Sequence, residues 1–345
     1  MNQKKIDISL ILRGVMASYV VFWHTLGYQG DIPAIINIPG RVSVWFFFGI
    51  SGYVISHGFF HGKYRFNWRG LREYFFRRIL RIFPLFYLLS ALSIFIIIFF
   101  SLAMPFNWID IPAEFFAIQW SHSYALNGVF WTLGIEIQYY LVAPLICFII
   151  FKCGRFHLIF SIIFLSLLWF WPHLANQWFG ASYDNRTTIG SLQFFFVGCI
   201  MAMLTTNTSF VEVISHRYIL LILSIFGFSI LGATAWLYQN ALGDFWRLTG
   251  ALMTLLSIAS LLAVHIGVEN LNIAPGFLSR SLMRIGVLAY GIYAWHGILL
   301  KYFAMFQDEF VLTYLVSLIL AAVSFFLIEK PAIAFGRRSR NAASH

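Results

Sequence analysis

Long apolar segments recur along the whole chain, and short polar stretches separate them. A helix needs about 20 predominantly apolar residues to cross the hydrocarbon core of a bilayer. The pattern therefore predicts an all-α integral membrane protein, a polytopic bundle of about ten transmembrane helices. We take residues 1–345 as a single membrane-embedded domain, because no polar stretch is long enough for a separate soluble one. The expected spans are Ile6–Tyr28, Pro39–Phe60, Ile79–Ala103, Thr132–Phe151, Phe156–Ala175, Ile189–Leu204, Tyr218–Tyr238, Phe245–Gly267, Leu282–Phe303 and Val311–Ile328.

The basic residues are distributed unevenly between the loops of this bundle. With both termini in the cytoplasm, most Lys and Arg residues fall on the cytoplasmic side, as the positive-inside rule requires. Topology and anionic lipid then account for most of the net charge of +10, which leaves little reason to expect a nucleic-acid partner. The composition also indicates a membrane protein, because 60% of the residues are hydrophobic and only 10% are charged. The basic residues left toward the other side are Arg41, Arg186, Arg247 and Lys301.

Two ionisable residues, Arg13 and His24, lie inside the first apolar segment, which shows no cleavage site and is expected to remain as a helix. Eleven residues on an α-helix return to within about 20° of the starting direction and rise about 16 Å. Both side chains therefore project from one face. Buried charges of this kind usually face the protein interior or a water-filled cavity and mark a functional site. The structural alternative is a snorkelling arginine and a core histidine with satisfied ring nitrogens.

A basic run from Arg69 to Pro84 leads into the third expected span. Arg77 and Arg81 are spaced i,i+4 and Arg78 and Arg81 i,i+3, so they form one basic ridge at the start of the helix. Guanidinium groups bind phosphate through paired hydrogen bonds, which suits a polyphosphate ligand such as the nucleotide end of coenzyme A. Ordinary anchoring of the topology explains the same run equally well.

Glu136 lies about one turn inside the fourth expected span, where a carboxylate needs a partner or a cavity. Tyr139 and Tyr140 follow it at i+3 and i+4, on the same helical face. By depth Glu136 matches His24 at the end of the first span, and a histidine oriented by a carboxylate is a general-base arrangement. The alternative is an isolated carboxylate that faces a water-filled vestibule.

Two further patches could line a polar pocket. Ser51-Gly52 interrupts the second span, and the glycines at 49 and 52 allow close helix packing, which we favour, or a broken turn beside a ligand. Tyr293 and His296 share a helical face at i,i+3 in the ninth span. The scattered cysteine and histidine residues show no ligand spacing, so we expect no metal.

Seven short motifs follow one another along the chain. They are Arg13-x10-His24, Gly40-Arg-Val-Ser-Val-Trp-Phe-Phe-Phe-Gly-Ile-Ser51-Gly52, Arg77-Arg78-x2-Arg81-x2-Pro84, Trp131-Thr-Leu-x2-Glu136-x2-Tyr139-Tyr140, Phe194-Phe-Phe-Val-Gly198, Tyr290-Gly-Ile-Tyr-Ala-Trp-His296 and Glu329-Lys330-Pro331. Their order resembles acyltransferase family 3 over nearly the whole chain. Gly49 stands where a larger aliphatic residue is usual in that family, and Thr132 replaces the usual serine.

That resemblance implies a multi-pass O-acyltransferase of the bacterial cytoplasmic (inner) membrane. Such an enzyme moves an acyl group, by family habit acetyl, from cytoplasmic acyl-CoA to a hydroxyl of a cell-surface or exported glycan. O-antigen lipopolysaccharide and exopolysaccharide are glycans of this kind. Acyl-CoA is then a co-substrate, with no permanently bound cofactor, and the acceptor is a glycan or a lipid-linked saccharide.

The residues and the resemblance together give a working mechanism. The basic ridge holds the phosphates of acyl-CoA, and Arg13 steers the donor inward. His24 is the general base for the acceptor hydroxyl, and Glu136 orients its ring. Among the pocket residues, hydroxyl groups and nearby backbone amides are candidate oxyanion donors. The expected pocket residues are Ser51, Trp131, Thr132, Tyr139, Tyr293 and His296.

A transporter or flippase of an acyl donor or a glycan-lipid is the alternative function. Polar residues within membrane helices suit it equally well. The sequence shows no convincing internal repeat, which disfavours a transporter built from inverted halves. A sensor or scaffold would leave Arg13 and His24 without a role.

Overall fold

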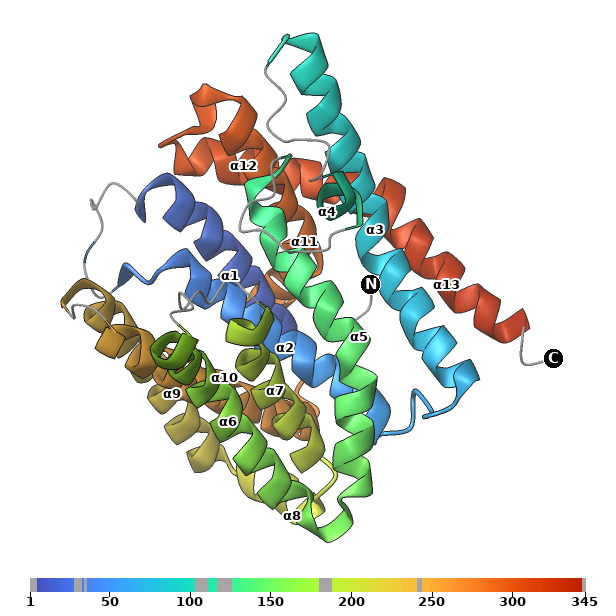
Figure 1. Cartoon of the computed structure of the whole chain (residues 1–345), viewed down its shortest axis with the longest axis vertical. Coiled ribbons are helices and arrows are strands. Elements are labelled where there is room, and N and C mark those ends of the chain that lie inside the picture. Colours follow the sequence, from blue (N-terminus) through green and yellow to red (C-terminus); the bar gives the residue numbers. More distant parts are fainter. Residues whose placement is uncertain are drawn as a thin grey trace. The chain divides into compact units, whose positions relative to one another are not determined.

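The chain folds into helices throughout the described part of a computed structural model, which covers residues 5–27, 33, 36–102, 111–116, 126–179, 188–240 and 244–342 (Figure 1). The predicted all-α fold is thereby confirmed. The elements are α1 (Ile8–Thr25), α2 (Gly40–Phe60), α3 (Trp68–Phe99), α4 (Ile111–Phe116), η4 (Gly128–Phe130), α5 (Trp131–Lys152), η5 (Gly154–Phe156), α6 (His157–Phe179), α7 (Thr188–Leu204), α8 (Thr208–Ile214), α9 (Arg217–Asn240), α10 (Asp244–Asn270), α11 (Phe277–Tyr302), η6 (Ala304–Phe306), α12 (Phe310–Ser324), η7 (Phe325–Glu329) and α13 (Lys330–Ala342).

The number of membrane spans agrees with the prediction of about ten. Within the described residues, nine helices are long and apolar enough to cross a bilayer. The pair α7 and α8, bent by 105° at a short break, brings the number to ten if it forms one span. The expected segment ends Tyr28 and Ala103, and the residue Arg186, lie outside the described residues.

The third helix differs most from its expected bounds. α3 begins at Trp68 rather than Ile79, because the Asn67 side chain caps it by accepting a 2.9 Å hydrogen bond from the Gly70 amide. The basic ridge is therefore part of a continuous helix and not of a segment leading into one. The last expected span is also longer, since helical structure continues from α12 through η7 into α13.

The chain divides into two compact units, which are described separately. Unit 1 comprises Met1–Lys63 and Val142–Val287, and unit 2 comprises Tyr64–Leu141 and Leu288–His345. The helices α5 and α11 each contribute residues to both units.

The core of unit 1 is the close packing of α2 against α7 (Figure 1). A side chain at Gly52 would collide with the Phe195 carbonyl, and one at Gly198 would collide with the Gly49 carbonyl. Around this crossing, Trp45 stacks on Phe194 with ring centroids 4.4 Å apart. The glycines thus let the backbones of α2 and α7 approach directly, and the stacked aromatic rings pack beside this contact.

The core of unit 2 is built from α3, the first turns of α5, the later part of α11 and the chain from α12 to α13. The Tyr74 hydroxyl on α3 donates a 3.1 Å hydrogen bond to the Tyr140 carbonyl on α5. The Tyr290 hydroxyl on α11 donates a 3.0 Å hydrogen bond to the Ile82 carbonyl. Helix α13 packs beside α3, where Gly336 lies against Leu80. The hydroxyl of Tyr74 thus joins α3, which carries the basic ridge, to α5, which carries Glu136, and that of Tyr290 joins α3 to α11.

Candidate active site

In unit 1, helix α1 carries both Arg13 and His24, as predicted. Arg13 is buried, with 8% of its surface exposed, and His24 is half-buried. The Nδ1 atom of His24 lies 3.0 Å from the Val20 carbonyl oxygen one turn earlier. A carbonyl can only accept, so Nδ1 carries the hydrogen and the lone pair of the neutral ring is on Nε2. The helix itself thus sets the tautomer that a base acting through Nε2 requires.

The segment around Arg13 packs directly against α11. A side chain added at Gly14 would lie 2.9 Å from the Gly286 nitrogen, and one at Gly286 would collide with the Leu10 carbonyl. This backbone contact fixes α1 one residue beyond Arg13. Arg13 also interacts electrostatically with His265 on α10. The arginine is therefore an interior residue and does not snorkel to the surface.

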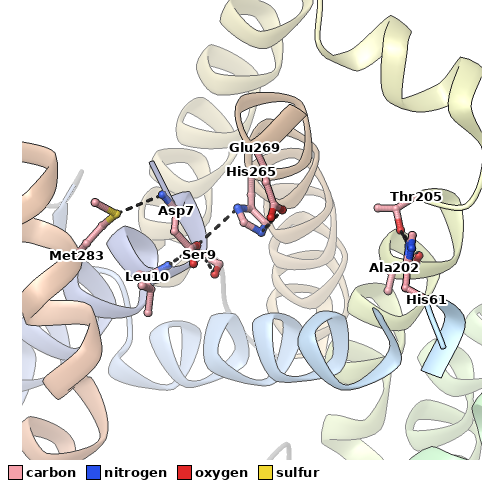
Figure 2. A network of polar contacts seen from close by, with 9 residues as sticks. All are labelled: Asp7, Ser9, Leu10, His61, Ala202, Thr205, His265, Glu269 and Met283. Carbon is pink, nitrogen blue, oxygen red and sulfur yellow. Dashed lines mark hydrogen bonds and ion pairs between the residues drawn. The ribbon is translucent and has the colours of Figure 1, made fainter. Parts of the chain in front are cut away.

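Figure 2 shows a polar network at the start of α1 that the sequence analysis missed. Asp7 caps α1 by accepting a 3.1 Å hydrogen bond from the Leu10 amide, and its own amide contacts the Met283 sulfur at 3.2 Å. The buried His265 ring lies between two carboxylates, with Nδ1 3.7 Å from Asp7 Oδ1 and Nε2 3.7 Å from Glu269 Oε2. A histidine inside an apolar segment, as at position 265, was the available signal. The network ties the start of α1 to α10 and α11.

A second contact in Figure 2 fixes the end of α2. The Thr205 hydroxyl donates to the Ala202 carbonyl at 2.6 Å, so it accepts the 2.7 Å hydrogen bond from His61 Nε2. His61 also stacks on His57, with ring centroids 4.0 Å apart. Across the described residues, no group of three or more His, Cys, Asp or Glu side chains has the geometry to hold a metal ion.

Ser51 belongs to the packing core of unit 1. It is 9% exposed and lies in α2, which runs unbroken from Gly40 to Phe60. The alternative of a broken turn at Ser51-Gly52 is therefore wrong. The predicted role of these glycines in close helix packing is confirmed by the α2 and α7 crossing.

In unit 2, the three arginines of the basic ridge have different surroundings. Arg77 forms a 2.7 Å ion pair with Glu73 on its own helix. The Arg78 guanidinium lies 5.7 Å from the Tyr74 ring centroid and 5.2 Å from that of Tyr140. It also attracts the carboxylate of Glu136. Stacking on two aromatic rings holds a guanidinium in place while leaving N–H groups in its plane for an anion.

Arg81 lies further along the same helix and faces another set of groups. It interacts electrostatically with Tyr140, Tyr290 and Glu329. Arg78 thus attracts Glu136 and Arg81 attracts Glu329 within unit 2, and both arginines are half-buried. A role of the ridge beyond anchoring the topology stays a prediction.

Glu136 is half-buried on α5, with its partner one turn further on. The Tyr140 hydroxyl donates a 2.5 Å hydrogen bond to Glu136 Oε1. Tyr139, the other tyrosine predicted on that face, is completely buried. The pairing of Glu136 with His24 stays a prediction, because these residues belong to different units.

The remaining pocket residues gather where η4 leads into α5. The hydroxyls of Thr132 and Tyr293 each donate a 3.1 Å hydrogen bond to the Val129 carbonyl. The His296 ring is fully buried, 5.4 Å from that of Tyr293 between centroids. Trp131, at the start of α5, is half-buried. These residues lie in one unit, and a polar pocket shared by them stays a prediction.

Asn127 connects η4 with α11 and was missed as a functional candidate. Its Nδ2 donates a 3.0 Å hydrogen bond to the Ala294 carbonyl on α11, and its side-chain oxygen accepts from the Val129 amide at 3.3 Å. It is completely buried. Its position as a polar residue directly before an apolar helix was the signal that could have identified it.

These observations define the class of protein: it is a multi-pass helical membrane protein with clusters of ionisable residues inside its helices. The acyltransferase domain family known as acyltransferase 3 matches residues 6–329, and the chain belongs to this family. The resemblance seen in the sequence motifs is confirmed.

Several relatives are similar to this chain in sequence. O-acetyltransferase OatA of Staphylococcus aureus strains NCTC 8325 / PS 47 and COL is 25% identical over 319 residues, which covers 85% of this chain and 52% of the relative. The chain spans about half the length of the relatives it matches. No solved structure matches it.

Proposed function

We propose that this protein is a membrane O-acyltransferase that moves an acyl group from cytoplasmic acyl-CoA to a hydroxyl of a cell-surface or exported glycan. Membership of the acyltransferase 3 family supports the reaction class, and the name of the relative O-acetyltransferase OatA supports acetyl as the acyl group. The observation that carries the proposal is the His24 ring, whose Nδ1 hydrogen is directed to the Val20 carbonyl.

The chemical step starts at His24 Nε2. This atom takes the proton of the acceptor hydroxyl as the oxygen attacks the thioester carbonyl. The tetrahedral intermediate then expels the coenzyme A thiolate, which recovers that proton from the imidazolium, so an ester and a thiol are the products. Glu136 stabilises the imidazolium, and a hydroxyl such as that of Thr132 or Tyr293 stabilises the oxyanion.

Arginines are the proposed contacts for the acyl donor. In unit 2, Arg78 and Arg81 contact the phosphates of acyl-CoA. Arg77, which is paired with Glu73, adds positive charge beside them. In unit 1, Arg13 guides the donor along α1 toward His24. The rise of about 16 Å between these two residues is comparable with an extended pantetheine arm.

The orientation follows from the distribution of charge. Both termini and the basic ridge face the cytoplasm, where acyl-CoA is made, and the protein resides in the bacterial inner membrane. His24 then lies near the opposite surface, toward which the acceptor glycan or lipid-linked saccharide is presented. Acyl-CoA is a co-substrate and no cofactor is bound permanently.

The test is transfer by purified protein in liposomes supplied with acetyl-CoA labelled in the acetyl group. An enzyme releases coenzyme A and passes label to a glycan acceptor or to water. A transporter or flippase moves label across the bilayer and leaves the thioester intact. Mass spectrometry of envelope glycans from cells with and without the protein then identifies the acceptor, and no acetyl-sized difference in any glycan would oppose the proposal.

A further inference from the structure

Glu329 is a buried carboxylate that the proposed mechanism does not use. It ends the π-helical turn η7 between α12 and α13. Its side chain is 5% exposed, whereas Phe326 and Leu327 beside it are 60% and 72% exposed. The carboxylate therefore points into unit 2 and away from the apolar outer surface. A carboxylate placed inside a membrane helix is costly and usually has a function.

The π-helical turn is what directs Glu329 inward. Along α12 the buried residues Ser317, Ala321 and Ser324 follow each other at spacings of four and three, as on one face of an α-helix. The next residue of that face would be Ile328, but the buried residue is Glu329, five positions after Ser324. A π-turn accommodates one extra residue, and such turns are frequent at functional sites.

Helix α3 packs beside the π-turn η7, and Arg81 on α3 is the basic group that attracts the Glu329 carboxylate. Tyr290 on α11 interacts electrostatically with both Arg81 and Glu329, and its hydroxyl donates a hydrogen bond to the Ile82 carbonyl. Within the described residues, the Oε1 atom of Glu329 has no hydrogen-bond partner. A carboxylate that served only to close a structural hydrogen-bond network would be fully satisfied. Glu329 instead supplies a negative charge opposite Arg81.

We propose that Glu329 is the positioning residue for Arg81 at the acyl-donor site. This inference rests on the proposed function, in which Arg81 contacts a phosphate of acyl-CoA. A guanidinium presents five N–H donors in a planar fork, so Arg81 can be attracted by a nearby carboxylate and keep its donors for a phosphate. The negative charge of Glu329 keeps the Arg81 side chain within unit 2, and Glu329 does not itself touch the donor.

The experiment measures steady-state acyl transfer with acetyl-CoA as the varied substrate. Glu329→Gln keeps the shape of the side chain and removes its charge, so KM for acetyl-CoA should rise about tenfold while kcat changes less than about twofold. Glu329→Asp, which keeps the charge, should recover most of the lost affinity. Glu309→Gln is the matched control, because Glu309 is an exposed carboxylate at the other end of α12, and it should behave like the native protein.

A double-mutant cycle with Arg81→Ala separates positioning from a general structural role. If Glu329 acts through Arg81, Glu329→Gln should raise KM in the native background and cause no further rise when Arg81 is already Ala. Should Glu329→Gln fail to fold, the same cycle with Glu329→Asp should give a smaller rise that also disappears in the Arg81→Ala background. Equal rises in both backgrounds would overturn the inference.

The cycle also distinguishes failure of the inference from failure of the proposed function. If Arg81→Ala raises KM for acetyl-CoA and Glu329→Gln does not, the donor site stands and only the role of Glu329 is wrong. If Arg81→Ala itself leaves KM unchanged, Arg81 is not a donor contact, and both the donor-site assignment and this inference are wrong.

Discussion

The Tyr140 hydroxyl donates a 2.5 Å hydrogen bond to Oε1 of Glu136, one turn earlier on α5. The ring of the same tyrosine lies 5.2 Å from the Arg78 guanidinium, which in turn attracts Glu136. One side chain thus contacts both a residue proposed for the donor site and a residue proposed for the chemical step. A change at Tyr140 should therefore affect Glu136 without removing its charge.

Tyr140→Phe keeps the ring beside Arg78 and removes the hydrogen bond to Glu136. A hydrogen bond to a charged group contributes about 1.5–3 kcal/mol, so we expect kcat to fall by about one to two orders of magnitude with KM for acetyl-CoA nearly unchanged. Glu136→Gln should cause a similar loss, and the two changes together should not add. Tyr87→Phe, an exposed tyrosine on α3, is the control. Full activity of folded Tyr140→Phe would show that the hydrogen bond is irrelevant to the reaction.

Arg78→Ala and Arg81→Ala should each raise KM for acetyl-CoA, because a charge-assisted phosphate contact contributes about 1.5–3 kcal/mol. Acceptor affinity should hardly change. Arg72 on the same helix is exposed, so the Arg72→Ala variant should have the same KM for acetyl-CoA as the native protein. If the Arg78 and Arg81 variants also titrate like the native protein, the basic ridge only anchors the topology.

Arg13→Lys keeps the positive charge in α1 and removes the planar fork. A donor contact that grips two oxygen atoms should fail with Lys, whereas a simple counter-charge to the carboxylates near His265 should tolerate it. We therefore expect normal expression and monodispersity for Arg13→Lys but loss of acetyl-CoA binding, as for Arg13→Ala. Normal binding combined with poor folding would make Arg13 a structural partner of the Asp7, His265 and Glu269 network.

Gly198→Ala should destabilise unit 1, because the added methyl group would collide with the Gly49 carbonyl on α2. Overpacking of this kind costs about 1–3 kcal/mol. The thermal midpoint in detergent should fall, whereas Gly276→Ala should leave it unchanged, since nothing lies within 4 Å of a side chain added there. An unchanged midpoint for Gly198→Ala would mean that the two helices can separate at little cost.

The apolar pattern was sufficient to predict the membrane-spanning helices, because each span must satisfy its own backbone hydrogen bonds. It did not predict the start of α3, where the Asn67 cap and not hydrophobicity sets the boundary. The sequence also predicted that Arg13 and His24 lie on the same helix, α1, and that Arg13 is an interior residue. The sequence could not reveal that Val20 sets the His24 tautomer or that a π-turn directs Glu329 inward, because both depend on atomic geometry.

The contacts of Asp7 and Asn127 illustrate the same limit. Asp7 contacts Met283 and His265, and Asn127 contacts Ala294, all of them far away along the chain. Such partners are determined by how helices pack, which the order of polar and apolar residues does not specify. A polar residue directly before an apolar helix can be recognised as a cap, but its second partner cannot.

The central claim is that His24 is the general base of acyl transfer, and its most direct test is the initial rate of labelled acetyl transfer from acetyl-CoA by purified His24→Ala. Removal of a general base should lower this rate by about two to four orders of magnitude, with insertion and folding intact. His216→Ala, which removes an exposed histidine, should retain the native rate. A folded His24→Ala protein that transfers acetyl at the native rate would contradict the account.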